Sequence, residues 1–100
     1  MDKCCHTDMW KGMDRFFIAL GDENRQKILH LLGKGKQVRV NDIAEASHLS
    51  RPAISHHLKV LKDADILQCE KKGKEVYYYC NKDTILEMLE KTTKAIKACC

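Results

Sequence analysis

Paired cysteines near both ends of the chain have the side-chain chemistry to bind a metal ion. Cys4 and Cys5 precede His6, and Cys99 and Cys100 are the last two residues. Thiolates are soft ligands that favour zinc, cadmium, lead, copper(I) or arsenic(III) over hard cations. Adjacent cysteines rarely close an unstrained disulfide, but they can share one thiophilic ion with a third ligand. We therefore expect metal ligands among these five residues, with incidental cysteines on frayed ends as the alternative.

The remaining cysteines and three of the histidines have structural explanations. Cys69 and Cys80 are expected to be core thiols of a hairpin. Short hairpin loops do not place these two cysteines opposite each other. His57 is expected to be a packed residue, and His30 and His48 are expected to be structural or surface groups. None of these five residues is predicted to be a metal ligand.

One face of a predicted helix after residue 50 gathers polar side chains that can read a nucleic acid. At spacing i, i+4, i+8 and i+11, opposite an apolar stripe, lie Arg51, Ser55, Lys59 and Lys62. An arginine can donate two hydrogen bonds to a guanine edge, while serine and histidine can reach bases or phosphates. Lysines are expected to meet phosphates, a contribution that salt weakens. The alternative is a solvated helix face without a partner.

Two neighbouring features favour DNA over that alternative. Ser50 is an N-cap residue by type and Pro52 lies in the first turn, so this helix begins on a polar end after a short helix and a tight turn. Such a helix pair places its second helix in the DNA major groove. A basic hairpin tip around Gly73 can lie along the backbone or the minor groove. The candidate DNA contacts are Ser50, Arg51, Ser55, His56, Lys59, Lys62, Lys71, Lys72 and Lys74.

The spacing of apolar residues predicts the helices that position these side chains. A first helix of about three turns is indicated by Trp10, Met13, Phe17 and Leu20. Asp22 is a suitable N-cap for a second helix that ends at 33–35, and a third short helix is expected over 41–47. The residues expected to face the core from the second, third and fourth helices are Ile28, Leu29, Leu32, Ile43, Ala44, Ile54, Leu58 and Leu61.

After residue 66 the pattern changes to that of strands. Leu67–Lys71 and Glu75–Cys80 are expected to pair as a hairpin, because valine and tyrosine favour strands. Asn81 can cap a last helix that carries Ile85, Leu86, Leu89 and Ile96. The order is therefore helix-helix-helix-helix-strand-strand-helix. We predict a mainly α fold with a small β-hairpin, a winged helix-turn-helix, as a single domain over 1–100 with flexible ends at 1–8 and 98–100.

Length and composition limit the class of protein. A chain of 100 residues has room for one core and little more. It shows no nucleophile–base pair, phosphate loop or compact carboxylate pair, so we do not expect an enzyme. No apolar run approaches the roughly 20 residues that cross a bilayer, and no secretory signal is evident, so we expect a cytoplasmic protein with reduced thiols and no membrane partner. The net charge of +4 lies wholly in residues 34–100, which suits a polyanionic partner.

Two segments resemble the ArsR/SmtB family of winged-helix transcriptional repressors. They are residues 19–25, ALGDENR, and residues 49–61, LSRPAISHHLKVL, and the similarity extends over roughly residues 13–97. The resemblance implies a homodimer, joined through the first and last helices, that blocks a promoter until an effector releases it. It also implies that the recognition helix contacts operator DNA through Ser50, Arg51, Ser55, His56 and Lys59.

A dimer agrees with the amount of apolar surface on the first and last helices. These helices offer more of it than a small monomer can cover, and the residues are Trp10, Met13, Phe17, Ile85, Leu86, Leu89 and Ile96. The expected partners are therefore a second copy of the chain and double-stranded operator DNA, which a two-fold dimer contacts at two half-sites.

The sequence departs from the family pattern at three places. Asp65 stands where a glycine usually ends the recognition helix, and aspartate tolerates the left-handed conformation better than most residues do. Arg39 and Asn41 occupy the positions of the family's thiolate site on the third helix. The family's carboxylate–histidine site on the last helix has no histidine here, and the helix offers only Asp83, Glu87 and Glu90.

With both usual sensing sites missing, the effector is the open part of the prediction. We expect a repressor that needs no cofactor to bind DNA and is released by a soft metal or metalloid (zinc, cadmium, lead or arsenic) or a thiol-reactive species at the terminal cysteines. The alternatives are a DNA-binding regulator without a metal effector, a thiol-based redox or persulfide sensor, and a thiol-rich metal buffer whose helix-turn-helix is incidental.

Overall fold

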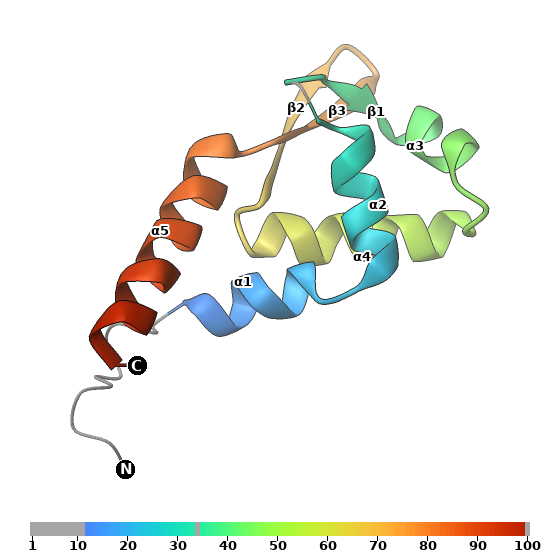
Figure 1. Ribbon diagram of the computed structural model, residues 1–100. Helices are drawn as coiled ribbons and strands as arrows, with labels where there is room; N and C mark the ends of the chain where they lie inside the picture. The colour runs from blue at the N-terminus through green and yellow to red at the C-terminus, as the bar shows by residue number, and fades with distance from the viewer. Residues whose placement is uncertain (1–11, 34, 100) are drawn as a thin grey trace.

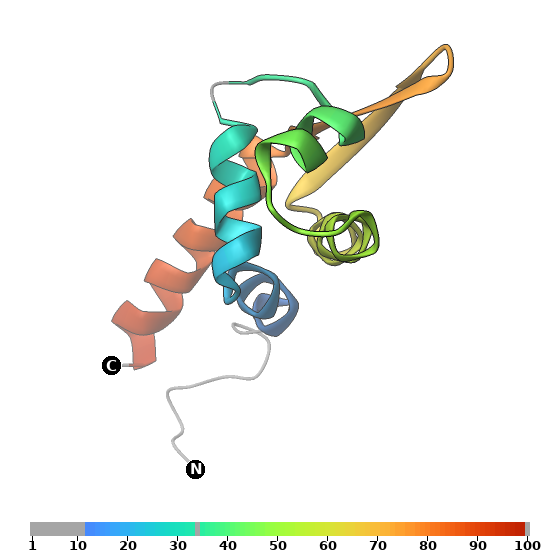
Figure 2. The ribbon, with the colours of Figure 1, turned by 90° about the vertical axis from the view of Figure 1, so that its right-hand side faces the viewer.

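The structure is a computed structural model that describes residues 12–33 and 35–99. Along these residues the elements are α1 (Met13–Leu20), α2 (Glu23–Leu31), β1 (Val38–Arg39), α3 (Val40–Ala46), α4 (Arg51–Asp63), β2 (Leu67–Lys72), β3 (Glu75–Cys80) and α5 (Lys82–Cys99). Figure 1 shows α1–α4 and the sheet gathered into one body, from which the far half of α5 extends. In Figure 2 the β2–β3 hairpin projects on the side of the body opposite to α5.

This arrangement confirms the predicted winged helix-turn-helix. The helix order and both hairpin strands are as expected, and β2 continues one residue further than predicted, to Lys72. The segments expected to be flexible, 1–8 and 98–100, lie wholly or partly outside the described residues, and α5 continues to Cys99. Within the described ranges, no helix has the length and apolar character needed to span a membrane.

The core is apolar and joins the first four helices to the base of the hairpin. Its fully buried residues are Phe16, Ala19, Ile28, Leu32, Ile43, Ile54, Leu58, Leu61, Ile66 and Leu67. Six of the eight residues predicted for the second, third and fourth helices are among them, and Leu29 packs partly buried against the cluster. Because no polar or charged side chain is buried among the residues that the structure describes, polar groups are left for the surface.

The first helix buries residues that the predicted apolar stripe did not include. Phe17, which was expected to contribute apolar surface to a dimer, is 41% exposed, whereas Phe16, which was not part of the predicted stripe, is 1% exposed. Spacings of three and of four both satisfy a helical pattern, and the buried stripe here runs in steps of three through Met13, Phe16 and Ala19. Trp10 lies outside the described residues. Phe17 therefore lies on the surface, among the residues predicted for the dimer contact.

The predicted caps of α2 and α4 are confirmed. Asp22 Oδ1 accepts hydrogen bonds from the backbone N–H groups of Asn24 at 2.8 Å and Arg25 at 3.2 Å. Ser50 Oγ accepts one from the Ala53 N–H at 3.3 Å. These bonds satisfy N–H groups that have no partner within the helix, and so they fix where each helix begins.

The sheet has a third strand that the sequence pattern did not predict. In the described part of the chain the strand order is β1-β3-β2, and Val38 and Arg39 pair with Tyr78 and Tyr77. A two-residue strand has no periodicity of its own, so only its partner reveals it. In the hairpin register Leu67 faces Cys80, whereas Cys69 faces Tyr78, which confirms that the two cysteines are not opposite each other.

The recognition helix α4 ends in a left-handed turn at Asp65, as predicted from its position. Asp65 has φ 60°, and the N–H of Ile66 donates to the Leu61 carbonyl at 3.0 Å while the Asp65 N–H donates to the Lys62 carbonyl at 2.9 Å. This pair of bonds is the Schellman motif, and its apolar contact is supplied by Leu61 and Ile66, both fully buried. The turn redirects the chain from α4 into β2.

Replacing Asp65 by glycine should stabilise the protein. Because glycine adopts positive φ without the steric cost that a Cβ brings, Asp65→Gly should raise the free energy of unfolding by about 1 kcal/mol. Urea denaturation should show a higher midpoint with an unchanged slope. Gly73→Ala is the matched control, because Gly73 has φ +63° and an open surrounding; it should lower the free energy of unfolding by about 1 kcal/mol. A lower midpoint for Asp65→Gly would contradict this account.

Candidate DNA-binding surface

The recognition helix buries one face and exposes the other. Ile54, Leu58 and Leu61 are at most 1% exposed, so the packing of α4 is fixed by its apolar side. All nine predicted DNA contacts are exposed, and they are Ser50, Arg51, Ser55, His56, Lys59, Lys62, Lys71, Lys72 and Lys74. The first six lie on α4 or at its N-cap, and the last three lie at the tip of the hairpin, residues 71–74, which we call the wing.

The start of α4 presents donors suited to DNA. Ser50 accepts the capping bond from Ala53 through its hydroxyl oxygen, so its hydroxyl proton is directed elsewhere. Arg51 follows in the first turn and is exposed. Backbone N–H groups at a helix N-terminus favour phosphate, and an arginine there can reach a base edge. This end of α4 can therefore combine backbone positioning with base contact.

The lysines of α4 have partners within the chain. Lys59 Nζ lies 3.2 Å from Asp63 Oδ2, and both side chains are more than half exposed. An exposed pair of this kind contributes little, so a phosphate can displace the carboxylate. Lys62 reaches the base of the hairpin, where hydrogen bonding to Cys69 raises the pKa of its ammonium group above the ordinary value. This contact with Cys69 therefore favours the charged form of Lys62.

One lysine of the wing contacts β3 and Gln37, the residue before β1. Lys72 Nζ donates to Gln37 Oε1 at 2.6 Å and lies 5.3 Å from the centre of the Tyr77 ring. Lys71 and Lys74 are exposed beside it, and Gly73 supplies the positive φ of the turn. The wing therefore presents a positive tip with a defined orientation rather than a loose loop.

An ion-paired arginine beside the wing was not predicted as part of this surface. Arg39 donates to both carboxylate oxygens of Asp42 at 3.1 Å and lies 4.0 Å from Glu75. The hydrogen bond to Asp42 raises the pKa of Arg39, and the same bond lowers the pKa of Asp42. The spacing i, i+3 of Arg39 and Asp42 is the sequence signal that could have revealed this pair. In this chain, the ion pair between Arg39 and Asp42 therefore lies where the resemblance to the family implied a thiolate site.

The predicted metal ligands fall mostly outside the described residues. Cys4, Cys5, His6 and Cys100 lie outside them, and Cys99 is the last residue of α5. Within 12–33 and 35–99, no three His, Cys, Asp or Glu side chains cluster closely enough to hold a metal ion.

The other cysteines and histidines are placed as follows. Cys80 packs against the core, and burial raises the pKa of its thiol. Cys69 is partly exposed on β2 and faces Lys62. His30 and His48 are exposed, whereas His57 is partly buried.

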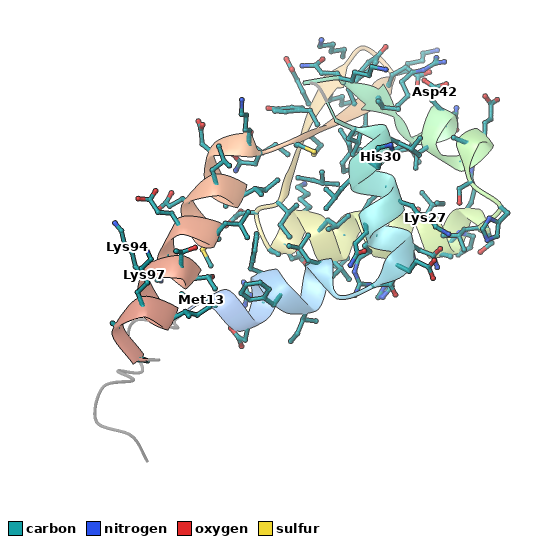
Figure 3. All side chains as sticks on the ribbon, in the orientation of Figure 1. Met13, Lys27, His30, Asp42, Lys94 and Lys97 are labelled. Carbon is teal, nitrogen blue, oxygen red and sulfur yellow. The ribbon has the colours of Figure 1, made fainter. Side chains whose placement is uncertain are left out.

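A second exposed surface is apolar and lies on α5 and α1. Its members are Phe17 (41% exposed), Ile18 (65%), Leu86 (53%), Leu89 (43%) and Ile96 (47%). Two residues expected to contribute are instead used within the monomer, because Met13 is 2% exposed and Ile85 packs against the core. Met13 lies where α1 meets α5, and its sulfur accepts a hydrogen bond from Thr92 Oγ1 at 3.5 Å (Figure 3). The surface that remains is narrower than predicted.

Comparison with known proteins identifies the class. The bacterial regulatory proteins of the arsR family match residues 22–68. The transcriptional repressor SdpR of Bacillus subtilis is 44% identical over 75 residues, which are 75% of this chain and 81% of that protein. The cadmium resistance regulator CadC of Listeria innocua is 41% identical over 75 residues, which are 75% of this chain and 63% of that protein. The solved structure of an ArsR-like transcriptional regulator from Rhodococcus sp. RHA1 has a TM-score of 0.80 at 27% identity, covering 92% of this chain and 85% of that one.

The fold and the exposed basic helix and wing define a winged helix-turn-helix regulator. The extent of the similarity to SdpR then fixes the family. The chain belongs to the arsR family of bacterial regulatory proteins, as the resemblance of its two signature segments predicted. Its relatives are transcriptional regulators rather than enzymes.

Proposed function

We propose that this protein is a transcriptional repressor that binds operator DNA as a homodimer and is released by an effector. The observation that supports DNA binding most directly is the exposure of all nine predicted contacts on α4 and the wing. They form a positive surface that the core does not use, on an element whose other face is fully buried. The names of SdpR, a repressor, and CadC, a cadmium resistance regulator, agree with this proposal.

In this proposal α4 and the wing contribute differently to binding. Arg51 reads a base edge from the first turn of α4, while the lysines of the wing contact phosphates. A base contact distinguishes sequences, whereas phosphate contacts strengthen binding to all DNA and weaken with salt. The two contributions can therefore be separated by substitution.

Arg51→Ala should lower affinity for the preferred sequence by about 1–3 kcal/mol per half-site and reduce discrimination against other sequences. The double substitution Lys72→Gln, Lys74→Gln should instead weaken binding to every duplex alike and reduce the slope of log affinity against log salt by about 2 per half-site. Fluorescence anisotropy over a salt series, on a duplex that the wild-type protein selects from a random library, measures both effects. If Arg51→Ala discriminates between DNA sequences as well as the wild type does, then α4 is not the helix that reads the bases.

The dimer is supported by the apolar surface of α5 and α1. Leu86, Leu89 and Ile96 form one stripe along α5, and Phe17 and Ile18 lie on α1, which packs against that helix. A stripe of this kind favours packing against a second copy. Because the hairpin projects on the opposite side from α5 (Figure 2), pairing through this stripe leaves α4 and the wing available to DNA.

Introducing charge into the stripe should separate the two chains. The double substitution Leu86→Glu, Leu89→Glu should convert the dimer to a monomer and weaken binding to a two-half-site duplex. Lys94→Glu is the control, because it changes the net charge by the same amount at a side chain that points away from α1 (Figure 3). Sedimentation equilibrium measures the mass. A wild-type protein that stays monomeric at tens of micromolar would refute the dimer.

The effector proposed is a soft metal, a metalloid or a thiol-reactive species at the terminal cysteines. The proposed ligands are Cys4, Cys5, His6, Cys99 and Cys100, whose sulfur and imidazole donors suit zinc, cadmium, lead or arsenic. Of these five, the structure places Cys99 at the end of α5, the helix that carries the apolar stripe. Ligands at this end of α5 would connect the effector to the spacing of the two recognition helices. A regulator without a metal effector and a redox or persulfide sensor are the competing possibilities.

Titration of the protein–DNA complex distinguishes these possibilities. Cadmium, arsenite or a persulfide should lower DNA affinity about 5–150-fold in the wild type, which corresponds to a coupling of about 1–3 kcal/mol. Metal binding should strengthen as pH rises, because thiolates bind only after deprotonation. The response should be lost in a Cys4→Ser, Cys5→Ser variant and in a Cys99→Ser, Cys100→Ser variant. Equal responses in the wild type and both variants would exclude the terminal cysteines as the sensor.

A further inference from the structure

The two signature segments of the sequence meet at one side chain, Arg25. Arg25 Nε donates to the Ala19 carbonyl at 2.7 Å, and Nη2 donates to the Ile18 carbonyl at 3.0 Å. The remaining nitrogen, Nη1, lies 3.2 Å from Nδ1 of His57 on the recognition helix. One guanidinium group of α2 therefore joins the end of α1 to the middle of α4.

The contact between Arg25 and His57 requires one particular form of the imidazole. A guanidinium group can only donate hydrogen bonds, so this bond forms when Nδ1 of His57 is the acceptor. That form is the neutral imidazole with its proton on Nε2. The charged and titratable groups beside it are Arg25 itself, Asp22 at the N-cap of α2, and His56, whose ring centre is 5.8 Å away.

Side chains of α2 bind the carbonyl groups at the end of α1. The last carbonyls of a helix have no partner within it, and here three in succession accept bonds from two neighbouring side chains. Arg25 binds the first two, and Gln26 Nε2 donates to the Leu20 carbonyl at 2.7 Å. Gly21 allows this close turn, because a Cβ there would lie 3.0 Å from the Phe17 carbonyl oxygen.

The same bonds connect the two surfaces of the protein. The side chain of Ile18 is 65% exposed on the apolar surface, while its carbonyl oxygen accepts a bond from Arg25. His57 lies directly after His56 and two positions from Ser55, both of which are exposed on the DNA-facing side of α4. A shift of α1 thus reaches α4 through a group with a fixed, planar geometry.

We propose that Arg25 is a positioning residue that sets the orientation of the recognition helix relative to α1 through its hydrogen bond to His57. The inference rests on the proposed function, since it presumes that α4 reads DNA and that α1 lies at the dimer surface. Arg25 itself does not touch DNA. Lysine cannot replace it, because a single ammonium group does not span three acceptors in one plane.

The test compares Arg25→Lys, His57→Phe and His57→Asn with the wild type on the same selected duplex. Arg25→Lys keeps the charge and His57→Phe keeps the ring, but both lose the bond, so affinity should fall about tenfold in each. His57→Asn places an amide oxygen near the position of Nδ1 and should stay within about threefold of the wild type. Arg15→Lys, on the exposed side of α1, is the control and should change nothing.

Three readouts distinguish positioning from a contact with DNA or a loss of stability. The slope of log affinity against log salt should be unchanged in Arg25→Lys, because the number of phosphate contacts is unchanged. The double variant Arg25→Lys, His57→Phe should bind no more weakly than Arg25→Lys alone, because Arg25→Lys has already removed the bond that His57→Phe removes. Thermal unfolding and sedimentation should show that all variants are folded dimers at the assay temperature.

A measurement without DNA tests the bond itself. The ¹⁵N shifts of the His57 ring at about pH 8 should report the neutral Nε2–H form in the wild type and a mixture of forms in Arg25→Lys. The inference is overturned if the wild type shows the Nδ1–H form, or if Arg25→Lys and His57→Phe bind DNA as the wild type does. It is also overturned if His57→Asn binds as weakly as His57→Phe. If the wild type shows the expected His57 shifts but selects no duplex from the library, the proposed function is refuted and the hydrogen bond is not.

Discussion

Burial of the apolar stripe of α4 is the constraint on which the rest of the structure depends. Ile54, Leu58 and Leu61 lie at the centre of a core contributed by α1, α2, α3 and the start of β2. A helix with one face fixed in this way cannot rotate, so its polar face must point to solvent. The Schellman turn at Asp65 then directs the chain into the hairpin, which projects from the body on the side opposite to α5 (Figure 2). Packing, rather than charge, determines where the basic residues lie.

The same constraint separates the tasks of the two ends of the molecule. The body presents α4 and the wing on one side, while α5 carries an apolar stripe on the other (Figure 2). The first helix belongs to both sides, because Met13 packs against α5 and the carbonyls of Ile18 and Ala19 bind Arg25. In the proposed dimer, a change in the packing of α5 would reach α4 through these contacts of α1 and through Ile85, which packs against the core. The proposed release by an effector bound far from the DNA would use these contacts.

Local rules predicted most of the fold, and long-range contacts supplied what those rules could not. The caps at Asp22 and Ser50 and the left-handed Asp65 follow from residue type and position, and the structure confirms them. The strand at Val38–Arg39 and the burial of Phe16, which the sequence pattern did not predict, depend on partners far along the chain. All nine predicted DNA contacts are exposed, but the contact between Arg25 and His57 joins residues 32 positions apart and has no signal in local spacing.

The central claim is that α4 and the wing form the surface that binds DNA. Titration of ¹⁵N-labelled protein with the selected duplex, followed by two-dimensional NMR, tests it residue by residue. The account predicts that the largest backbone shift changes occur at residues 50–62 and 71–74, with small changes along the apolar stripe of α5. Changes concentrated on α5, or on the outer face of α2 and α3 with α4 unaffected, would contradict it.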